Sequence, residues 1–148
     1  SRIRALAESH GLTNNGADVQ HAMLHELVQT VLRPSLSSQT IELSGPDLEI
    51  QVDQITSLAL ILHEWGTNST KYGALSLPDG KLSITVSVQA GTAHILWIET
   101  GRTDQMTERP GFGTSLVEAT AHQLQGSVSG AATENGFERT LTIPYAAT

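Results

Sequence analysis

One stretch of the chain, residues 63–73 (HEWGTNSTKYG), places three side chains of different chemistry at helical spacing. Glu64, Asn68 and Lys71 are four and then three residues apart, so in a helix they share one face. The preceding run 58–62 (LALIL) is wholly apolar, which predicts a helix that is buried at its start and opens onto a cleft later. A carboxylate, an amide oxygen and an ammonium group at the mouth of a cleft suit Mg²⁺ and phosphate oxygens.

The same spacing is also typical of an ordinary solvated helix face, and this alternative stays open. Three features favour a site. Asn is a poor helix former, and Gly66 inside a helix costs about 1 kcal/mol relative to Ala, so such a glycine usually marks the close approach of another group. Asn68 also offers a neutral oxygen to a hard cation, which suits Mg²⁺ held mainly by phosphate and water.

A second candidate site is Gly111-Phe112-Gly113, directly before an amphipathic stretch at 113–124. Backbone N–H groups at a helix N-terminus form an anion site. A hinge or a tight turn is the alternative. The aperiodic stretch 100–112 that leads into this motif has a length that is usually functional, and it could fold over a ligand, which favours phosphate.

A third candidate is Trp97-Ile98-Glu99, which ends a predicted strand and is followed by Thr100-Gly101. A carboxylate at the end of a strand beside a glycine can accept a hydrogen bond from an exocyclic amine such as that of adenine. An edge-strand acid that faces water explains the same residues equally well.

The elements that must position these motifs follow from periodicity and turn residues. We expect helices over 2–10, from an Asp18 cap to Pro34, from an Asp53 cap to Gly73, and over 113–124. We expect short strands at 40–43 and 48–52 about the turn 45–47, and hairpins of 82–88 with 93–99 and of 126–132 with 137–143. This order predicts an α/β (α+β) two-layer sandwich, with a mixed, largely antiparallel sheet covered by helices on one face.

Composition narrows the function further. The 148 residues suit a single globular unit, no apolar run is long enough to span a bilayer, and cysteine is absent, so we expect a cytoplasmic domain without membrane contact. The net charge of −7 argues against nucleic-acid binding. Thr67 stands four residues after His63, so the His-Glu-x-x-His metal motif is missing, as are a serine-hydrolase elbow and a Walker-type loop.

Together and in this order, the motifs resemble the catalytic ATP-binding domain of sensor histidine kinases, which has the Bergerat (GHKL-type) ATPase fold. The HWE subgroup is the better match, because it is named for a histidine in its N box and a Trp-x-Glu in its G1 box. His63 and Trp97-x-Glu99 take these places, and 111–118 (GFGTSLVE) looks like the G2 box. The resemblance covers nearly the whole chain.

The resemblance implies a role for each matching residue, with ATP and Mg²⁺ as ligands. Asn68 would coordinate Mg²⁺ that bridges the phosphates, Glu64 would orient that site or a water in it, and His63 belongs to the same catalytic box. Lys71 and Tyr72 would reach phosphate or ribose. Glu99 would read adenine, and the remaining predicted nucleotide contacts are Gly101, Gly111, Phe112, Gly113 and Thr114. The implied reaction moves the γ-phosphoryl group of ATP to a histidine.

Two departures from the family pattern weaken this assignment. The Gly-Gly-Pro that usually follows the glutamate is replaced by Gly101-Arg102-Thr103, and Arg102 could either contact phosphate or obstruct the adenine pocket. Trp65-Gly66 replaces a Leu-Ala pair in the N box. A degenerate, nucleotide-free scaffold for phosphotransfer or a phosphatase therefore remains an alternative, as does a serine kinase of the same fold.

The resemblance also predicts the domain organisation and the partners. Residues 1–12 would be the tail of a helical dimerisation element, and 13–148 the catalytic domain. We expect the phosphoacceptor histidine on dimerisation helices upstream of this sequence, in a parent protein that is a homodimer and serves a response regulator.

Overall fold

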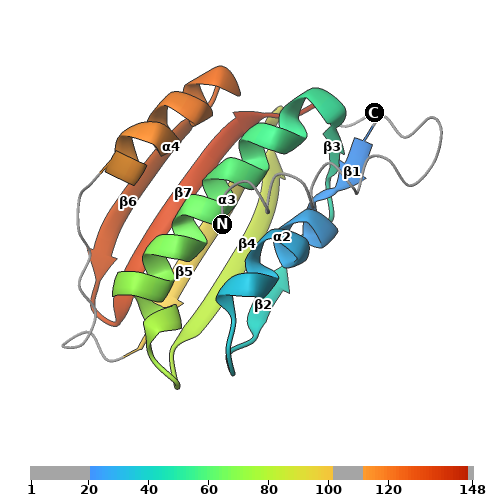
Figure 1. Cartoon of the computed structure of the whole chain (residues 1–148). Coiled ribbons are helices and arrows are strands. Elements are labelled where there is room, and N and C mark those ends of the chain that lie inside the picture. Colours follow the sequence, from blue (N-terminus) through green and yellow to red (C-terminus); the bar gives the residue numbers. More distant parts are fainter. Residues whose placement is uncertain (1–20, 102–111, 147–148) are drawn as a thin grey trace.

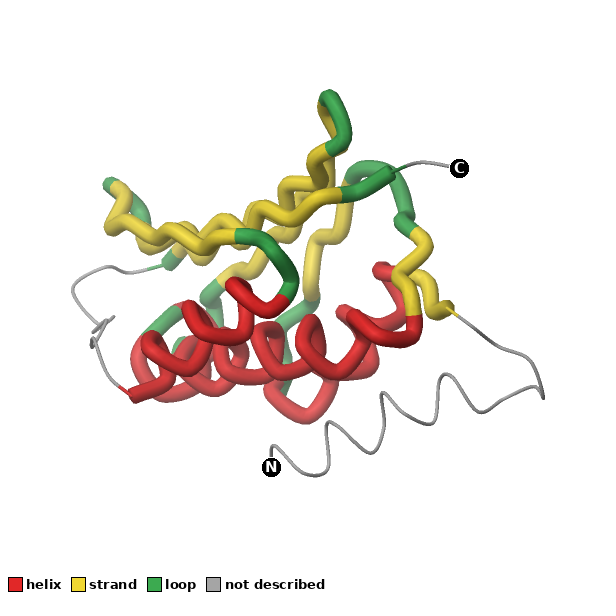
Figure 2. Tube along the Cα trace, turned by 90° about the horizontal axis from the view of Figure 1, so that it is seen from above, coloured by secondary structure: helices red, strands yellow, loops and turns green. Residues whose placement is uncertain are grey.

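The computed structural model describes residues 21–101 and 112–146. The expected helix at 2–10, the dimerisation tail at 1–12, the Asp18 cap, Arg102 and Gly111 lie outside these ranges. The chain forms two layers, with a five-stranded sheet on one side and helices α2, α3 and α4 covering a single face of it (Figures 1 and 2). The predicted two-layer α+β fold is confirmed.

The elements follow one another along the chain as short strands and helices first, then two long hairpins separated by α4. Their bounds are β1 His21–Met23, α2 Leu24–Leu32, η1 Arg33–Ser35, β2 Ile41–Ser44, β3 Glu49–Gln51, α3 Val52–Tyr72, η2 Ala74–Ser76, β4 Lys81–Gln89, β5 Thr92–Thr100, α4 Phe112–Gln123, β6 Ser127–Thr133 and β7 Gly136–Pro144. Among the described residues, no helix combines the length and apolar character needed to span a membrane.

The main sheet has the strand order β2-β4-β5-β7-β6. Its strands pair antiparallel except for β2, which runs parallel to β4. Alternate residues of the three central strands point toward the helices and are buried, as the period-two pattern predicts. Trp97 on β5 lies opposite Ile84 on β4 and Arg139 on β7, so all three occupy the helix-facing side.

Helix α3 runs across the middle of that side, between α2 and α4 (Figure 1). Its first half is packed into the core, where Leu58, Ala59, Ile61 and Leu62 are almost wholly inaccessible to solvent. The helix ends at Gly73, as the sequence indicated. The predicted buried run 58–62 is thus confirmed, apart from the half-buried Leu60. The helix does not start buried, however, because Val52 and Asp53 are exposed, and Trp65 and Ser69 in its second half are buried.

Two predicted helix starts are wrong. Residues 21–23 form strand β1 rather than the interior of a helix, because they pair antiparallel with β3, and α2 begins only at Leu24. The long helix begins at Val52 with Gln51 at its N-cap, and no side chain caps it. Asp53 lies in the first turn of the helix. Its negative charge interacts favourably with the positive end of the helix dipole there, but its side chain does not cap the helix.

The strands predicted at 40–43 and 48–52 exist, but they belong to different sheets. β2 joins the edge of the main sheet beside β4, whereas β3 pairs with β1 in a separate two-stranded sheet. The turn at Gly45 therefore leads the chain from one sheet to the other. Gly45 has φ +92°, and a Cβ there would clash with the backbone of Val86, so only glycine fits this crossing.

Candidate nucleotide site

A cavity of about 440 Å³ lies between α3, α4 and the strands β6 and β7. This volume is within the range of about 300–1,000 Å³ that is typical of small-molecule sites. Its lining is contributed by Trp65 and Asn68 from α3, Val117 and Glu118 from α4, residues 128–132 from β6, and residues 137–139 from β7. The wall is mainly apolar, with a few polar groups placed among the apolar ones.

Asn68 is the predicted catalytic side chain that lines this cavity. Its neighbours on the same helix face do not line it. Glu64, one turn earlier, is buried with 8% of its surface exposed, and Lys71, nearly one turn later, is exposed. Burial therefore differs along the predicted polar face of α3, and Asn68 is the member of this face that lines the cavity formed by the described residues.

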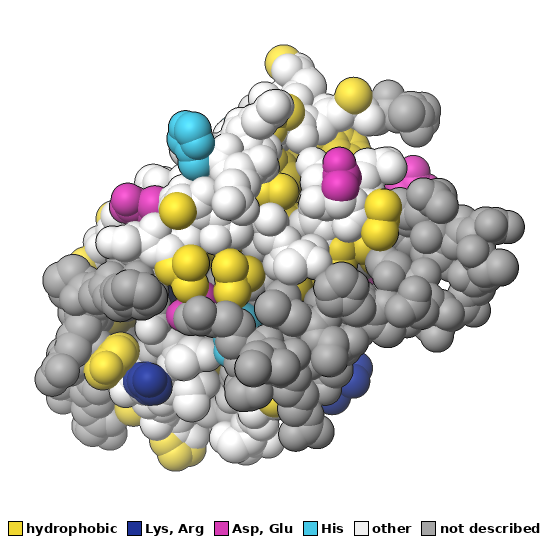
Figure 3. Space-filling view, turned by 45° about the horizontal axis from the view of Figure 1, so that its top comes forward, with side chains coloured by type: hydrophobic (Ala, Val, Ile, Leu, Met, Phe, Trp, Pro, Cys, Tyr) yellow, Lys and Arg dark blue, Asp and Glu magenta, His cyan; other side chains and the backbone are white. Residues whose placement is uncertain are grey.

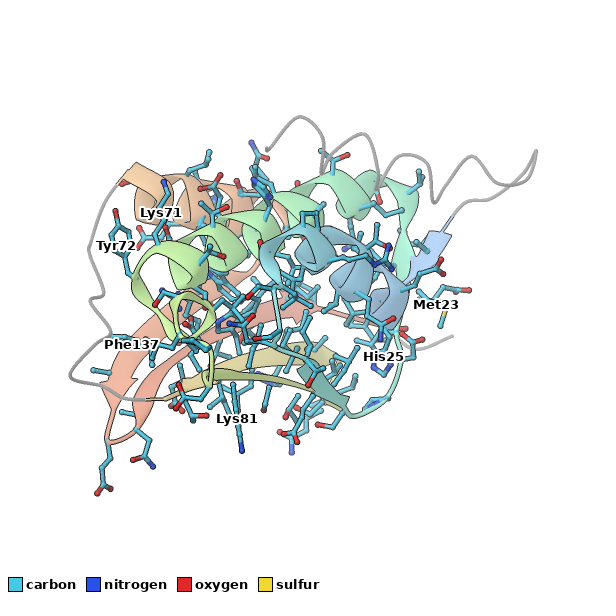
Figure 4. All side chains as sticks on the ribbon, turned by 60° about the horizontal axis from the view of Figure 1, so that its bottom comes forward. Met23, His25, Lys71, Tyr72, Lys81 and Phe137 are labelled. Atoms are coloured by element: carbon cyan, nitrogen blue, oxygen red, sulfur yellow. The ribbon has the colours of Figure 1, made fainter. Side chains whose placement is uncertain are left out.

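Two further predicted residues of the N box lie on α3, His63 near the middle of the helix and Tyr72 at its end. His63 and Tyr72 are half-buried. Figure 4 shows Lys71 and Tyr72 at the same end of the molecule as Phe137 of β7, with Lys71 directed toward α4. Met23 and His25 lie at the opposite end of the molecule.

Glu99 is the most enclosed charged residue of the described chain, with none of its surface exposed. Its Oε1 accepts hydrogen bonds from the Ser69 hydroxyl at 2.7 Å and the Ala74 backbone N–H at 2.9 Å. Its Oε2 accepts from Trp97 Nε1 at 2.8 Å and from Arg139 Nη1 at 2.6 Å. A carboxylate has about four lone-pair sites, so these four donors satisfy it.

Two predicted or neighbouring glycines, Gly73 and Gly101, lie close to Glu99 in space or along the chain. A Cβ on Gly73 would lie 2.1 Å from Glu99 Oε1, so only glycine lets the backbone after α3 come this close to the carboxylate. Gly101 follows β5 directly, and its backbone N–H donates to the Asn135 carbonyl at 3.0 Å. Gly101 thus ties the end of β5 to the turn between β6 and β7.

The predicted glycine loop meets the start of α4. The helix begins at Phe112, one residue before the predicted start, so Gly113 and Thr114 belong to its first turn. Gly111 lies outside the described residues, as does the stretch 102–110 that was expected to form a lid. The first turn of a helix supplies backbone N–H groups and a positive dipole end, which can bind phosphate.

Several residues line the cavity that no sequence motif indicated, above all Arg139, Trp65 and Phe137. Arg139 carried a signal: it alternates with Leu141 and Ile143 on the inward face of β7, where a charge requires a buried partner. That partner is Glu99. Trp65 packs edge-to-face against Trp97, with ring centroids 5.5 Å apart, and it also lines the cavity.

On the face drawn in Figure 3, apolar and uncharged side chains cover most of the described surface, and acidic and basic groups are scattered. The formal net charge of the chain is −7. A bound polyphosphate would thus depend on nearby donors and a cation.

Sequence comparison places the chain among bacterial kinases. No family model matches it. Blue-light-activated histidine kinase 1 of Erythrobacter litoralis (strain HTCC2594) is 32% identical over 150 residues, which cover 97% of this chain and 42% of that protein. The blue-light-activated histidine kinase of Rhizobium johnstonii is 32% identical over 149 residues, covering 98% and 43%. The chain thus spans less than half the length of these relatives.

Solved structures show the same fold. The histidine kinase domain of the Erythrobacter litoralis EL346 blue-light activated kinase superposes with a TM-score of 0.74 at 15% identity, covering 97% of this chain and 77% of that one. The catalytic domain of histidine kinase ThkA gives 0.64 at 16% identity, covering 87% and 99%. The chain is thus related in sequence to blue-light-activated histidine kinases, and it has the fold of histidine kinase catalytic domains.

Proposed function

We propose that this domain binds ATP with Mg²⁺ and presents the γ-phosphoryl group for transfer to a histidine on dimerisation helices of its parent protein. The observation that carries the proposal is the cavity, which places the Asn68 amide in one wall and α4, whose first turn contains Gly113 and Thr114, in another. An amide oxygen that can bind Mg²⁺ and the N-terminal turn of a helix, with its free backbone N–H groups, suit a nucleotide phosphate chain.

Asn68 would be the protein ligand of Mg²⁺. Within residues 21–101 and 112–146, no group of three or more His, Asp or Glu side chains is placed to hold a metal ion. This fits Mg²⁺, which keeps several waters and is usually held by one or two protein oxygens together with substrate phosphates. When bound, the ion would neutralise phosphate charge, and Glu64, one turn earlier on α3, would orient Asn68 or a water.

The other predicted residues surround the phosphate end of the proposed site. Lys71 and Tyr72 would contact phosphate or ribose from the end of α3, with His63 supporting the helix face. Gly111, Phe112, Gly113 and Thr114 would bring backbone N–H groups to the phosphates, and Gly101 would hold the end of β5 beside them. Because phosphoryl transfer rests on positioning and charge neutralisation, no covalent role is needed for any of them.

The proposed reaction needs two partners that are not in this domain. The acceptor histidine would belong to the dimerisation helices of a homodimeric parent, and a response regulator would take the phosphoryl group from it. The domain would act in the cytoplasm, where ATP and the regulator are available.

One observation favours a second candidate, a degenerate module that has lost nucleotide and acts as a scaffold for phosphotransfer or a phosphatase. Glu99, the residue expected to read adenine, is fully buried and already accepts four hydrogen bonds from the protein itself. A domain that no longer binds a base could retain such a carboxylate for structure alone.

The test is a titration of the purified chain with a fluorescent ATP analogue, with and without Mg²⁺, in the wild type and in Asn68→Ala. We expect saturable, Mg²⁺-dependent binding in the wild type and at least a tenfold loss in the variant. Thr70→Ala is the matched control, because Thr70 lies on the same helix, is exposed, and bonds only to its own helix at the Gly66 carbonyl. Absence of binding in a folded wild-type sample would favour the scaffold, and unchanged binding in Asn68→Ala would refute the metal-site assignment.

A further inference from the structure

We infer that the ring of Phe137 is the surface against which the base of the nucleotide lies, and that this contact makes the site prefer purine to pyrimidine nucleotides. The inference rests on the proposed nucleotide function and deepens it, because no sequence motif gave Phe137 a role. It is supported by the strand register around Phe137, by the packing of its ring, and by the small residues beside it.

Phe137 stands beside Glu99 on the helix-facing side of the main sheet. The two residues lie directly opposite each other on the antiparallel strands β7 and β5. Residues paired in this way point to the same face of the sheet, with Cβ atoms about 4.5–5.5 Å apart. Phe137 lines the cavity, whereas Glu99 is enclosed by its protein donors. A base at the Phe137 ring would therefore lie next to the carboxylate that is expected to read adenine.

The ring of Phe137 is held in place by the chain that follows α3. It packs against Ala74 and Leu77, which are both buried. Phe137 itself is half-buried and lines the cavity. Because the ring is already packed, little conformational freedom would be lost when a base lies against it. Trp65 on the opposite wall keeps only 3% of its surface exposed, so Phe137 is the more accessible aromatic side chain of the two.

Small residues on β6 leave room for a planar ring beside Phe137. Ala132 lies opposite Phe137, and Gly130 lies opposite Arg139, so both are on the helix-facing side of the sheet. Both also line the cavity. A Cβ on Gly130 would lie 3.4 Å or more from its nearest neighbours, so the packing there does not require a glycine. The small size of these two residues keeps the space above β6 open to a ligand.

An aromatic surface selects bases by the size of their rings. Removal of an aromatic side chain on which a base stacks raises the dissociation constant by roughly 5- to 150-fold. Because the gain grows with the apolar area brought into contact, a two-ring purine should gain more than a one-ring pyrimidine. Adenine and cytosine both carry an exocyclic amine, so a comparison of ATP with CTP changes the ring size and keeps an amine in both ligands.

The decisive experiment measures the dissociation constants of ATP and CTP with Mg²⁺, by competition with a fluorescent ATP analogue, in the wild-type chain and in Phe137→Leu. We expect the wild type to bind ATP at least about fivefold more tightly than CTP, and this ratio to fall at least about threefold in the variant. Phe137→Tyr keeps the ring and should keep the ratio. Tyr145→Leu, which removes a half-buried aromatic ring just beyond the other end of β7, is the control and should also keep it.

The ratio distinguishes a contact with the base from a structural role. If Phe137 only supported the fold, its replacement would weaken both nucleotides alike, so an unchanged ratio in folded Phe137→Leu would overturn the inference and leave the proposed function standing. Failure of the wild type to bind either nucleotide would overturn both.

Ala132→Leu tests the same placement without removing a contact. The larger side chain would fill the space opposite Phe137, so ATP binding should weaken at least about tenfold while the melting temperature of the ligand-free chain stays the same or rises. Ala119→Leu, at an exposed position of α4 outside the cavity lining, should leave ATP binding within about twofold. Undiminished ATP binding in Ala132→Leu would refute the position assigned to the base, and this variant decides if Phe137→Leu fails to fold.

Discussion

At the scale of single residues, the close approach of Gly73 to Glu99 links the end of the N-box helix to the central sheet. Glu99 accepts from Ser69 on α3 and from Ala74 immediately after it, so the carboxylate fixes the chain on both sides of the helix end. This contact explains why residue 73 is a glycine although its backbone, at φ −117° and ψ −151°, is open to any residue. The constraint on residue 73 is steric, because a side chain there would collide with the Glu99 carboxylate.

Gly73→Ala should therefore lower the free energy of unfolding by about 1–3 kcal/mol, the usual cost of overpacking a well-filled site. The added methyl group would lie 2.1 Å from Glu99 Oε1 and force the carboxylate away from its donors. Urea denaturation measures the change. Gly130→Ala is the matched control, because its Cβ would make only ordinary contacts, at 3.4 Å and beyond. Equal stability of the two variants would contradict the geometry around Glu99.

At the scale of elements, helix α3 positions the site even though its N-terminus lacks a side-chain cap. Gln51 occupies the N-cap position with extended backbone angles, φ −69° and ψ 150°, which suit a capping residue. Gln54 stands at the third helical position, where its amide could reach back to the N-cap. A serine at position 51 would complete this capping box.

Gln51→Ser should thus raise the free energy of unfolding by about 1 kcal/mol, measured by urea denaturation. Gln89→Ser, at the exposed end of β4, makes the same chemical change away from a helix and should leave stability within about 0.5 kcal/mol. If Gln51→Ser is neutral or destabilising, the helix begins elsewhere or Gln51 has a role in β3 that outweighs capping.

At the scale of the whole molecule, the cavity joins two parts of the chain that are distant in sequence. Its walls come from α3 and from the segment that contains α4, β6 and β7. A ligand bound there would hold the helical layer to one edge of the sheet. Nucleotide binding should consequently stabilise the entire fold and not only one loop.

We expect the melting temperature of the wild-type chain to rise by roughly 5–10 °C when ATP and Mg²⁺ are present at about 100 times the dissociation constant. This range follows from about 2.7 kcal/mol of linkage stabilisation and about 2–4 °C per kcal/mol for a domain of this size. Differential scanning calorimetry measures the shift, and Asn68→Ala should abolish most of it. A ligand-independent melting temperature under saturating conditions would contradict nucleotide binding by the native state.

Local patterns in the sequence are enough to predict most of the helices and strands and the fold class. The alternation in β4, β5 and β7 and the helical periods of α3 and α4 predicted these elements and the two-layer fold, because burial of one face imposes its own period on the sequence. The same patterns placed Asn68 on the polar side of α3. Residues that lie close in sequence sufficed for all of this.

Only the tertiary structure decided what those patterns could not encode. Strand β1 forms because residues 21–23 pair with β3, where His21 lies opposite Gln51 and Met23 lies opposite Glu49, far along the chain. The donors to Glu99 come from as far as Arg139, 40 residues along the chain. Long-range pairing overrides local propensity, and a buried charge is defined by partners that periodicity does not reveal.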